Sequence, residues 1–558
     1  MTRLRISALL ILLAFVLACG SERTVYYGGP ILTMDSTDQV VEALGIEGDR
    51  IAAVGSRESV LDWAGDGART IDLEGRAIVP GFVDAHGHFP GEGIYSKVVD
   101  LNSPPIGAVE KLNDIIALLA PRAAETSAGE WVVGMSYDDT LLAEDRHPTR
   151  EDLDRVSTTH PVAIIHVSGH LAVVNSMALE SVGLDRNSKD PAGGVLRRGP
   201  DGELTGVLEE NAMNFVQEKI LSPSPIESLR IVREGNRRVV AQGVTTVQNG
   251  LTPASLITAL QWMVRLGFIT PRIVLWPDMQ VADAVLAGEM TLPEASGPDL
   301  WIGAIKLIAD GSIQGYTGYL SEPYFVPPGD DSEFRGYPRI ARDELRERVT
   351  RYHAAGFQVA VHGNGDASID DILDAFDHAF NAHPREDVRP IIIHAQMARV
   401  DQLDRMAELE VLPSFFSLHT FYWGDRHRRL FMGPERAARM SPAATALEKG
   451  VRFTIHCDAP VVPLEPLRLV WSAVNRRTRS GFIVGPAERI DVMQALRAVT
   501  IDAAYSMFLD EDLGSLEVGK FADLAILSGS PLDVPETMDQ LSVVETIRGG
   551  DTIYRQGD

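Results

Sequence analysis

Cysteine is almost absent from this chain. Only Cys19 and Cys457 occur in 558 residues, so a framework of several disulfides is excluded. If Cys19 is acylated, as argued below, no disulfide can form within the chain, even in an oxidising compartment. A packed core must therefore hold the fold, and a hydrophobic fraction of 45% is enough for a large one.

Basic residues are scarce relative to acidic ones. The chain has 51 Lys and Arg against 78 Asp and Glu, a formal net charge of −27 at pH 7. Surfaces that bind DNA or RNA need a basic stripe to offset phosphate charge, so the composition argues against a nucleic-acid partner. The acidic excess does not identify a substrate, because such charges mostly occupy solvated helix faces.

Tandem repeats, low-complexity tracts and long hydrophobic runs are not evident either. An apolar run near the N-terminus, Ile6–Ala18, is too short to favour a stable transmembrane helix. It follows Arg3 and Arg5, and a basic segment before a short apolar segment is typical of a signal peptide. We therefore expect an exported protein.

The next residues, VLACGS (residues 16–21), resemble a bacterial lipoprotein cleavage site. This resemblance implies a signal peptide over residues 1–19 with cleavage before Cys19, which becomes the lipidated first residue. The protein would then bind a membrane of the bacterial cell envelope through its N-terminal lipid anchor. Ordinary secretion to the periplasm is the alternative.

The chain does contain metal-ligand residue types at the ends of strand-like runs. The segment VPGFVDAHGH (residues 79–88) ends in His86 and His88. On a strand, residues i and i+2 face the same side, so both imidazoles can converge on one cation. Such a pair alone is weak, because paired histidines also occur as ordinary loop residues.

Four further residues strengthen this signal. Lys306 lies in the middle of the apolar run Trp301–Asp310. A charged ammonium group there destabilises the fold unless the amine is neutral or its charge has a function. His362, His394 and Asp458 each follow an apolar run of their own. Taken singly, either histidine suits a structural role better than a metal site, but the set together favours a metal centre.

In order and in strand context, these six residues match the metal-site pattern of the amidohydrolase superfamily. The match is closest to its YtcJ-like (amidohydrolase 3) branch, and the chain resembles N-substituted formamide deformylase-like proteins. Phrases typical of the branch extend from about Val25 to the C-terminus, among them PGFVDAHGH, GHLAVVNSMAL, GELTGVLEE, IKLIADGSIQG, HGNGD, IIHAQ and LGSLEVGKFADLAIL. One departure is His456-Cys457, where the branch more often has small residues, and this affects the expected pocket floor.

The resemblance implies an α/β fold, a (β/α)8 TIM-like barrel over residues 80–508. It also implies a small β-sandwich built from both termini, residues 25–79 plus 509–558. A long insertion at about 100–235 carries strand-like runs of its own near residues 131–134 and 162–165. We therefore expect a folded cap and not a disordered linker.

The resemblance also assigns roles in the site. It implies two divalent metal ions, expected to be zinc, with His86, His88 and Asp458 at one and His362 and His394 at the other. Lys306 would be carboxylated and bridge them, and Asp458 would also act as the general base. In the alternative, Lys306 is unmodified and pairs with Asp310 or extends outward.

The expected activity is hydrolysis of a non-peptide C–N bond in a small molecule: an amide, a formamide or an N-acyl amine. The alternatives are a mononuclear deaminase or isomerase of the same fold, or a lipoprotein that only binds. Oligomeric state is left open, a homo-oligomer included. Five residues are candidates for substrate contact, although each aromatic suits the core as well: His170, Asn175, Tyr316, His419 and Trp423.

Replacement of Cys19 by Ala should release the protein from membranes, because the acyl chains that anchor it would have no attachment point. Membrane and soluble fractions of cells expressing the wild type and Cys19→Ala provide the measurement. Identical fractionation of the two as soluble proteins would contradict lipidation.

Overall fold

The computed structural model describes residues 23–220, 222–292 and 297–557. The expected signal peptide and Cys19 lie outside these residues. Within the described ranges, no helix is both long and apolar enough to cross a membrane.

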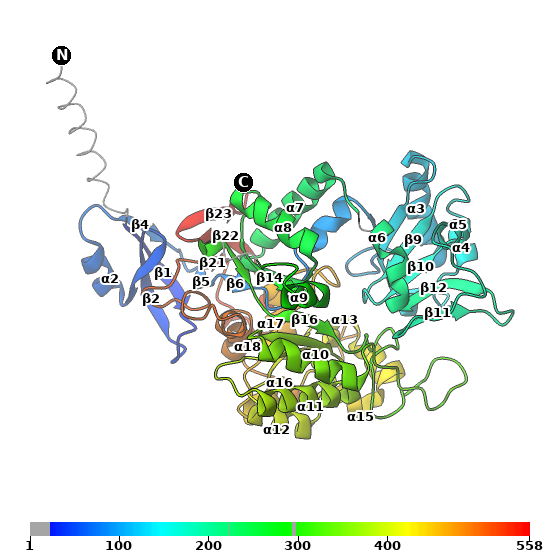
Figure 1. Ribbon diagram of the computed structural model, residues 1–558. Helices are drawn as coiled ribbons and strands as arrows, with labels where there is room; N and C mark the ends of the chain where they lie inside the picture. The colour runs from blue at the N-terminus through cyan, green and yellow to red at the C-terminus, as the bar shows by residue number, and fades with distance from the viewer. Residues whose placement is uncertain (1–22, 221, 293–296, 558) are drawn as a thin grey trace, which may run out of the picture.

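Strands from both ends of the chain combine in one eight-stranded sheet (Figure 1). Its strands β5 and β21 pair antiparallel with Ile78 opposite Ile526, which ties the C-terminal segment to the N-terminal one. The two-layer form of the expected sandwich stays a prediction. The elements of this unit are β1 (Arg23–Leu32), β2 (Val40–Glu47), β3 (Arg50–Gly55), α2 (Arg57–Ala64), β4 (Arg69–Asp72), β5 (Ala77–Pro80), β21 (Leu524–Leu527), β22 (Val543–Arg548) and β23 (Asp551–Arg555).

Parallel strands form the centre of the molecule. They make a four-stranded sheet in the order β15-β14-β13-β6 and a five-stranded sheet in the order β16-β17-β18-β19-β20. Most are buried throughout, as expected for parallel strands covered on both faces. Their bounds are β6 (Phe82–Val83), β13 (Val244–Thr252), β14 (Arg272–Pro277), β15 (Leu300–Ile302), β16 (Ile305–Ile308), β17 (Val359–Gly363), β18 (Ile391–His394), β19 (Leu412–Phe415) and β20 (Thr454–Ile455).

The two parallel sheets give a TIM-barrel-like arrangement in place of one closed hydrogen-bonded barrel within the described chain. The run Trp301–Asp310, expected as one strand, is interrupted between β15 and β16. A Cβ at Gly303 would lie 2.6 Å from Trp276 Nε1, so glycine permits this close approach. The two sheets also approach each other at their other edge strands, β6 and β20. There the His88 N–H donates to the Ala459 carbonyl at 2.8 Å, which joins the segments after these strands.

Helices alternate with these strands and pack against them. In α11, Ile369, Ile372, Leu373 and Phe376 are all buried, and their spacing defines one helical face. Burying each such side chain contributes about 1.5–3 kcal/mol. The α-helices after residue 220 are α7 (Pro225–Val240), α8 (Ala254–Arg265), α9 (Met279–Leu286), α10 (Arg342–Ala354), α11 (Asp366–Ala382), α12 (Val400–Glu408), α13 (His419–Tyr422), α14 (Gly424–Arg426), α15 (Gly433–Ala438), α16 (Ala443–Glu448), α17 (Pro466–Asn475), α18 (Val492–Ala498) and α19 (Ile501–Ser506).

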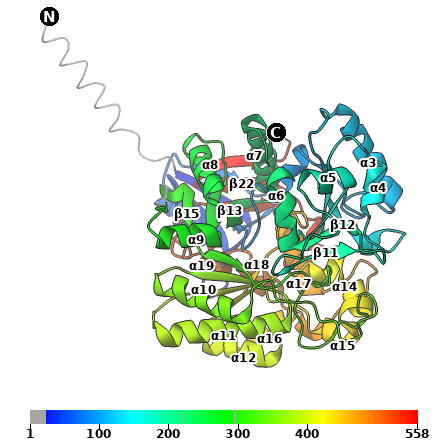
Figure 2. The same ribbon diagram turned by 45° about the vertical axis from the view of Figure 1, so that its right-hand side comes forward.

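The insertion between β6 and β13 contains a six-stranded sheet in the order β11-β12-β10-β9-β8-β7. It lies on the opposite side of the parallel strands from β1 and β2, to the right in Figures 1 and 2. We call this unit the cap. Its elements are β7 (Val99–Asp100), α3 (Leu112–Glu125), β8 (Val132–Tyr137), α4 (Arg150–Asp154), β9 (Val162–His166), β10 (Leu171–Val174), α5 (Ser176–Ser181), β11 (Gly194–Arg198), β12 (Leu204–Glu210) and α6 (Asn214–Ile220).

One buried ion pair ties the terminal sheet to the parallel strands. Arg272 of β14 donates from Nε and Nη2 to the two carboxylate oxygens of Asp523 at 3.0 and 3.1 Å, and both side chains are almost fully buried. Asp523→Ala should lower the free energy of unfolding by about 3–5 kcal/mol, because a buried guanidinium loses its buried carboxylate partner.

Urea unfolding followed by tryptophan fluorescence measures this loss. The control is Asp404→Ala, which removes a more exposed pair with Lys449 and should cost less than about 1 kcal/mol. Equal losses in the two variants would contradict a special role for the buried pair.

Candidate metal centre

The carboxyl-terminal side of the parallel strands brings the six predicted ligands into one cluster. Barrel-like folds place their sites at this edge. His86 and His88 follow β6, and Asp458 follows β20. The other three lie within strands: Lys306 in β16, His362 in β17 and His394 in β18.

Asp458 lies at the centre of three imidazoles. Its Oδ1 is 3.2 Å from His88 Nε2 and 3.6 Å from His86 Nε2, and its Oδ2 is 3.7 Å from His394 Nε2. The ligand atoms of His86, His88 and Asp458 all lie within 4.8 Å of one another. Two segments far apart in sequence therefore offer three ligand atoms to a single point.

Lys306 and His362 extend this cluster. Lys306 Nζ lies 3.2 Å from His86 Nε2, and the ring centroids of His362 and His394 are 4.5 Å apart. All six predicted ligands are thus connected by close contacts. The alternative for Lys306 is an ion pair with Asp310. In the structure Asp310 faces His362 instead, with 3.2 Å between Asp310 Oδ1 and His362 Nδ1.

The charges within the cluster are set by burial. Burial lowers the pKa of His86, His362 and His394 well below the ordinary value, so these imidazoles are neutral. Burial alone would raise the pKa of Asp458, but its close contacts with His88, His86 and His394 hold it well below its usual range. Asp458 is therefore an anion beside the neutral imidazoles of His86 and His394.

The donor set fits a divalent cation. Neutral imidazoles present lone pairs, and nitrogen and carboxylate ligands together suit borderline cations such as Zn²⁺. Asp458 Oδ1 is buried and has no well-aligned hydrogen bond to any described residue. A bound cation would satisfy it.

Two of the ligands have a strained backbone. His394 has φ +71° and Asp458 has φ +56°, a left-handed region that residues other than glycine rarely adopt. Each such residue costs about 1–3 kcal/mol and persists where the surroundings enforce it. The Asp458 N–H donates to the His86 carbonyl at 3.2 Å, so a contact between the first and last parallel strands helps to hold this conformation.

Supporting residues around the ligands were not identified from the sequence. Gln248, at 3.0 Å from His86 Nδ1, also accepts the Gly87 N–H. Asp310 accepts backbone N–H groups at 2.9–3.0 Å beside His362, and burial raises its pKa to about 7. The only sequence signal was that both residues lie at or just after strand-like runs.

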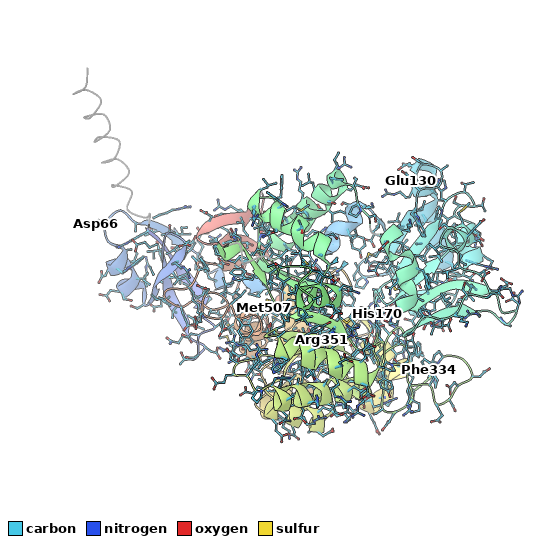
Figure 3. All side chains as sticks on the ribbon, in the orientation of Figure 1. Asp66, Glu130, His170, Phe334, Arg351 and Met507 are labelled. Carbon is cyan, nitrogen blue, oxygen red and sulfur yellow. The ribbon has the colours of Figure 1, made fainter. Side chains whose placement is uncertain are left out.

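Among the expected substrate contacts, His170 and His419 lie near the cluster. The His170 ring centroid is 5.0 Å from that of His362, and Figure 3 places His170 where the cap meets the parallel strands. Its Nδ1 lies 2.8 Å from Glu210 Oε2. The His419 ring centroid is 6.3 Å from that of His394, and its Nδ1 has no hydrogen-bond partner among the described residues.

The other three expected contacts make different interactions. Trp423 Nε1 donates to Asp138 of the cap at 3.0 Å, and the Tyr316 ring packs on Tyr324. Asn175 accepts the Val162 and Ala178 N–H groups and donates to two cap carbonyls, those of Ser157 and His160. Because its amide is fully used as an N-cap of α5, we assign Asn175 to the structure of the cap and not to substrate contact.

A second group of possible ligand types, Asp138, Asp139 and His166, lies in the cap. Arg426 donates to Asp138 Oδ2 at 2.9 Å, so a cation already occupies that side. The Ser168 N–H donates to His166 Nδ1, which places the ring proton on Nε2, 3.0 Å from Asp139 Oδ1. This group is accounted for as an ion-pair network between cap and barrel.

A cavity of about 490 Å³ lies between the start of the cap, α7 and the segment after β20. Its volume is within the range of small-molecule sites, about 300–1,000 Å³. Glu92 and Leu464 line it and also line a smaller cavity that reaches Asp84 and His88. The larger cavity therefore lies next to the metal-ligand cluster.

Curated proteins similar over nearly the whole chain come from plants and bacteria. Protein LONG AFTER FAR-RED 3 of Arabidopsis thaliana is 29% identical, with 94% of this chain and 90% of the relative covered. Putative amidohydrolase YtcJ of Bacillus subtilis (strain 168) is 28% identical, with 96% and 100% covered. N-substituted formamide deformylase of Arthrobacter pascens is 26% identical, with 94% and 97% covered.

Solved structures are also similar to this chain over most of its length. An uncharacterized metal-dependent hydrolase from Pyrococcus furiosus superposes with a TM-score of 0.69 at 28% identity, over 91% of this chain and 100% of that one. One from Pyrococcus horikoshii OT3 has a TM-score of 0.72 at 24% identity over 92% and 99%, which supports the fold. The family model described as "Amidohydrolase family" matches residues 69–554, so the chain belongs to the amidohydrolase family.

Proposed function

We propose that this protein hydrolyses a non-peptide C–N bond of a small molecule, such as an amide, a formamide or an N-acyl amine. The observation that carries the proposal is the ionised Asp458 among neutral imidazoles, with Lys306 against His86. The similarity to an N-substituted formamide deformylase makes formamides the first substrates to test.

Lys306 is suited to the bridging role that we propose for it. Burial lowers its pKa from 10.5 to about 7, so much of it is a neutral amine near neutral pH. A neutral amine adds carbon dioxide through its nitrogen and releases one proton to solvent, which gives an anionic carbamate whose two oxygens can ligate. The proposed sets are His86, His88 and Asp458 for one cation, His362 and His394 for the other, and carboxylated Lys306 for both.

Divalent cations bound there, expected to be zinc, would supply Lewis-acid activation of water and of a carbonyl group near neutral pH. Asp458 would accept the proton of the attacking water at a carboxylate oxygen and pass it to the leaving nitrogen. Its low pKa keeps it ionised and ready to accept this proton.

His170 is the proposed contact for the substrate from the cap side. Glu210 is fully buried and also lies 3.4 Å from an Arg339 guanidinium nitrogen. If His170 donates from Nδ1 to Glu210, its Nε2 is left with a lone pair beside His362. This nitrogen can accept a hydrogen bond from a substrate N–H group. A small-molecule substrate, an envelope location and the N-terminal lipid anchor complete the proposal.

Metal analysis of protein purified with zinc present tests the centre. We expect about two equivalents per chain, since the cluster offers two ligand sets joined by one lysine. One equivalent would favour the mononuclear deaminase or isomerase, and none would contradict both enzymes.

A screen of formamides and N-acyl amines with product mass spectrometry then tests which bond is cleaved. Ammonia released from an amidine or aminopurine without amide cleavage would favour the deaminase.

Two variants separate the roles of Lys306 and Asp458. Lys306→Ala should lose bound metal and regain part of the activity with short carboxylic acids, which can occupy the vacated space. Asp458→Asn should retain more metal while kcat falls on the order of 10²-fold or more, because the amide cannot accept the proton.

Bound metal and turnover are measured on both variants, together with the intact mass of the wild type for added carbon dioxide. Lys449→Ala, which removes a lysine from a surface ion pair, is the matched control and should leave metal content unchanged. Normal metal content and turnover in Lys306→Ala would rule out the bridging role. Normal turnover in Asp458→Asn would rule out the proposed base.

A further inference from the structure

His456 lies directly behind one of the proposed metal ligands. It follows β20, is fully buried, and its Nε2 is 3.0 Å from His394 Nδ1. Its other ring nitrogen, Nδ1, is 2.8 Å from Ser414 Oγ on β19. Thr454 Oγ1 in turn donates to Ser414 Oγ at 2.7 Å. The result is a continuous chain of hydrogen bonds from a metal ligand into the barrel core.

The chain of hydrogen bonds can be polarised in two directions. In one, Ser414 donates to His456 and His456 donates to His394 Nδ1. In the other, His394 Nδ1–H donates to His456 Nε2, and His456 Nδ1–H donates to Ser414. A neutral imidazole carries one proton, so the two directions place the proton of His394 on opposite ring nitrogens.

A cation at His394 is compatible with only one direction. His394 faces Asp458 with Nε2, at 3.7 Å, so Nε2 is the nitrogen available to a metal. Its lone pair is free only when the ring proton is on Nδ1, and that proton needs an acceptor in this buried site. His456 Nε2 is the acceptor in place.

His456 does not have the geometry of a ligand itself. Both of its ring nitrogens already lie within hydrogen-bond distance of a protein partner, His394 and Ser414. His86, His88 and His394, by contrast, each place Nε2 3.2–3.7 Å from an Asp458 oxygen. This difference separates a supporting histidine from the ligands it supports.

We propose that His456 is a positioning residue, whose Nε2 accepts the Nδ1–H of His394 and so holds the His394 ring in the tautomer and orientation that bind metal. The inference rests on the proposed function only in taking the cluster as a metal centre. It concerns the position where this sequence departs from the residues more usual in its branch.

Zinc affinity, measured by competition with a chromogenic chelator, tests the role without any substrate. His456→Met has a similar volume but no comparable acceptor, and it should weaken one zinc equivalent by about 10–100-fold. His456→Gln supplies an amide oxygen as acceptor and should bind zinc nearly as tightly as the wild type. His353 is a matched control, because it is equally buried but bonds the His383 carbonyl outside the cluster. His353→Met and His353→Gln should leave both equivalents unchanged.

Three outcomes would overturn the inference. Wild-type affinity in His456→Met would show that no acceptor is needed, and equal weakening in Met and Gln variants would indicate ring packing alone. Loss of a full equivalent in both variants at saturating zinc would identify His456 as a ligand. If His456→Met does not fold, Ser414→Ala removes the next acceptor and should also weaken zinc binding, so unchanged affinity there overturns the inference.

The same measurements separate this inference from the proposed function. A wild-type protein that binds zinc but cleaves no amide would defeat the proposed function and leave the role of His456 intact. Amide cleavage with unaltered zinc affinity in His456→Met would do the reverse.

Discussion

The site depends on holding the negative charge of Asp458 beside the uncharged imidazoles of His86 and His394. A carboxylate in such surroundings is costly unless it is paired, so its neighbours must be placed with little tolerance. Backbone hydrogen bonds between the segments after the first and last parallel strands provide this placement, and Asp458 adopts a left-handed conformation there. A divalent cation bound there would offset this charge.

Around this charge, each buried candidate histidine ligand contacts a polar residue that lies on another strand or in the segment after another strand. Gln248 contacts His86, Asp310 contacts His362, and His456 contacts His394. Such partners fix the tautomer and the orientation of a ring, so they contribute to metal affinity without touching the metal. Burial keeps the imidazoles of His86, His362 and His394 neutral beside these polar partners.

The cap completes the site from the opposite side. His170 lies beside His362 and is held by Glu210, which Arg339 also contacts. The cap is tied to the barrel through Asp138, which both Trp423 and Arg426 contact. The cavity beside the cluster is lined by residues at the start of the cap, by α7 and by the segment after β20. The cavity is therefore lined by both cap and barrel residues, whereas the cluster of candidate ligands belongs to the barrel strands and the segments that follow them.

The sequence by itself determined the ligand types, their order and their strand contexts, because strand periodicity and residue chemistry are local properties. It also indicated the family, the joining of both ends and a folded insertion. The tertiary structure decided the partners: Asp310 faces His362 and not Lys306, Asn175 caps a helix, and one expected strand breaks at Gly303. Hydrogen-bond partners depend on which distant strands become neighbours, and one chain read alone does not contain those distances.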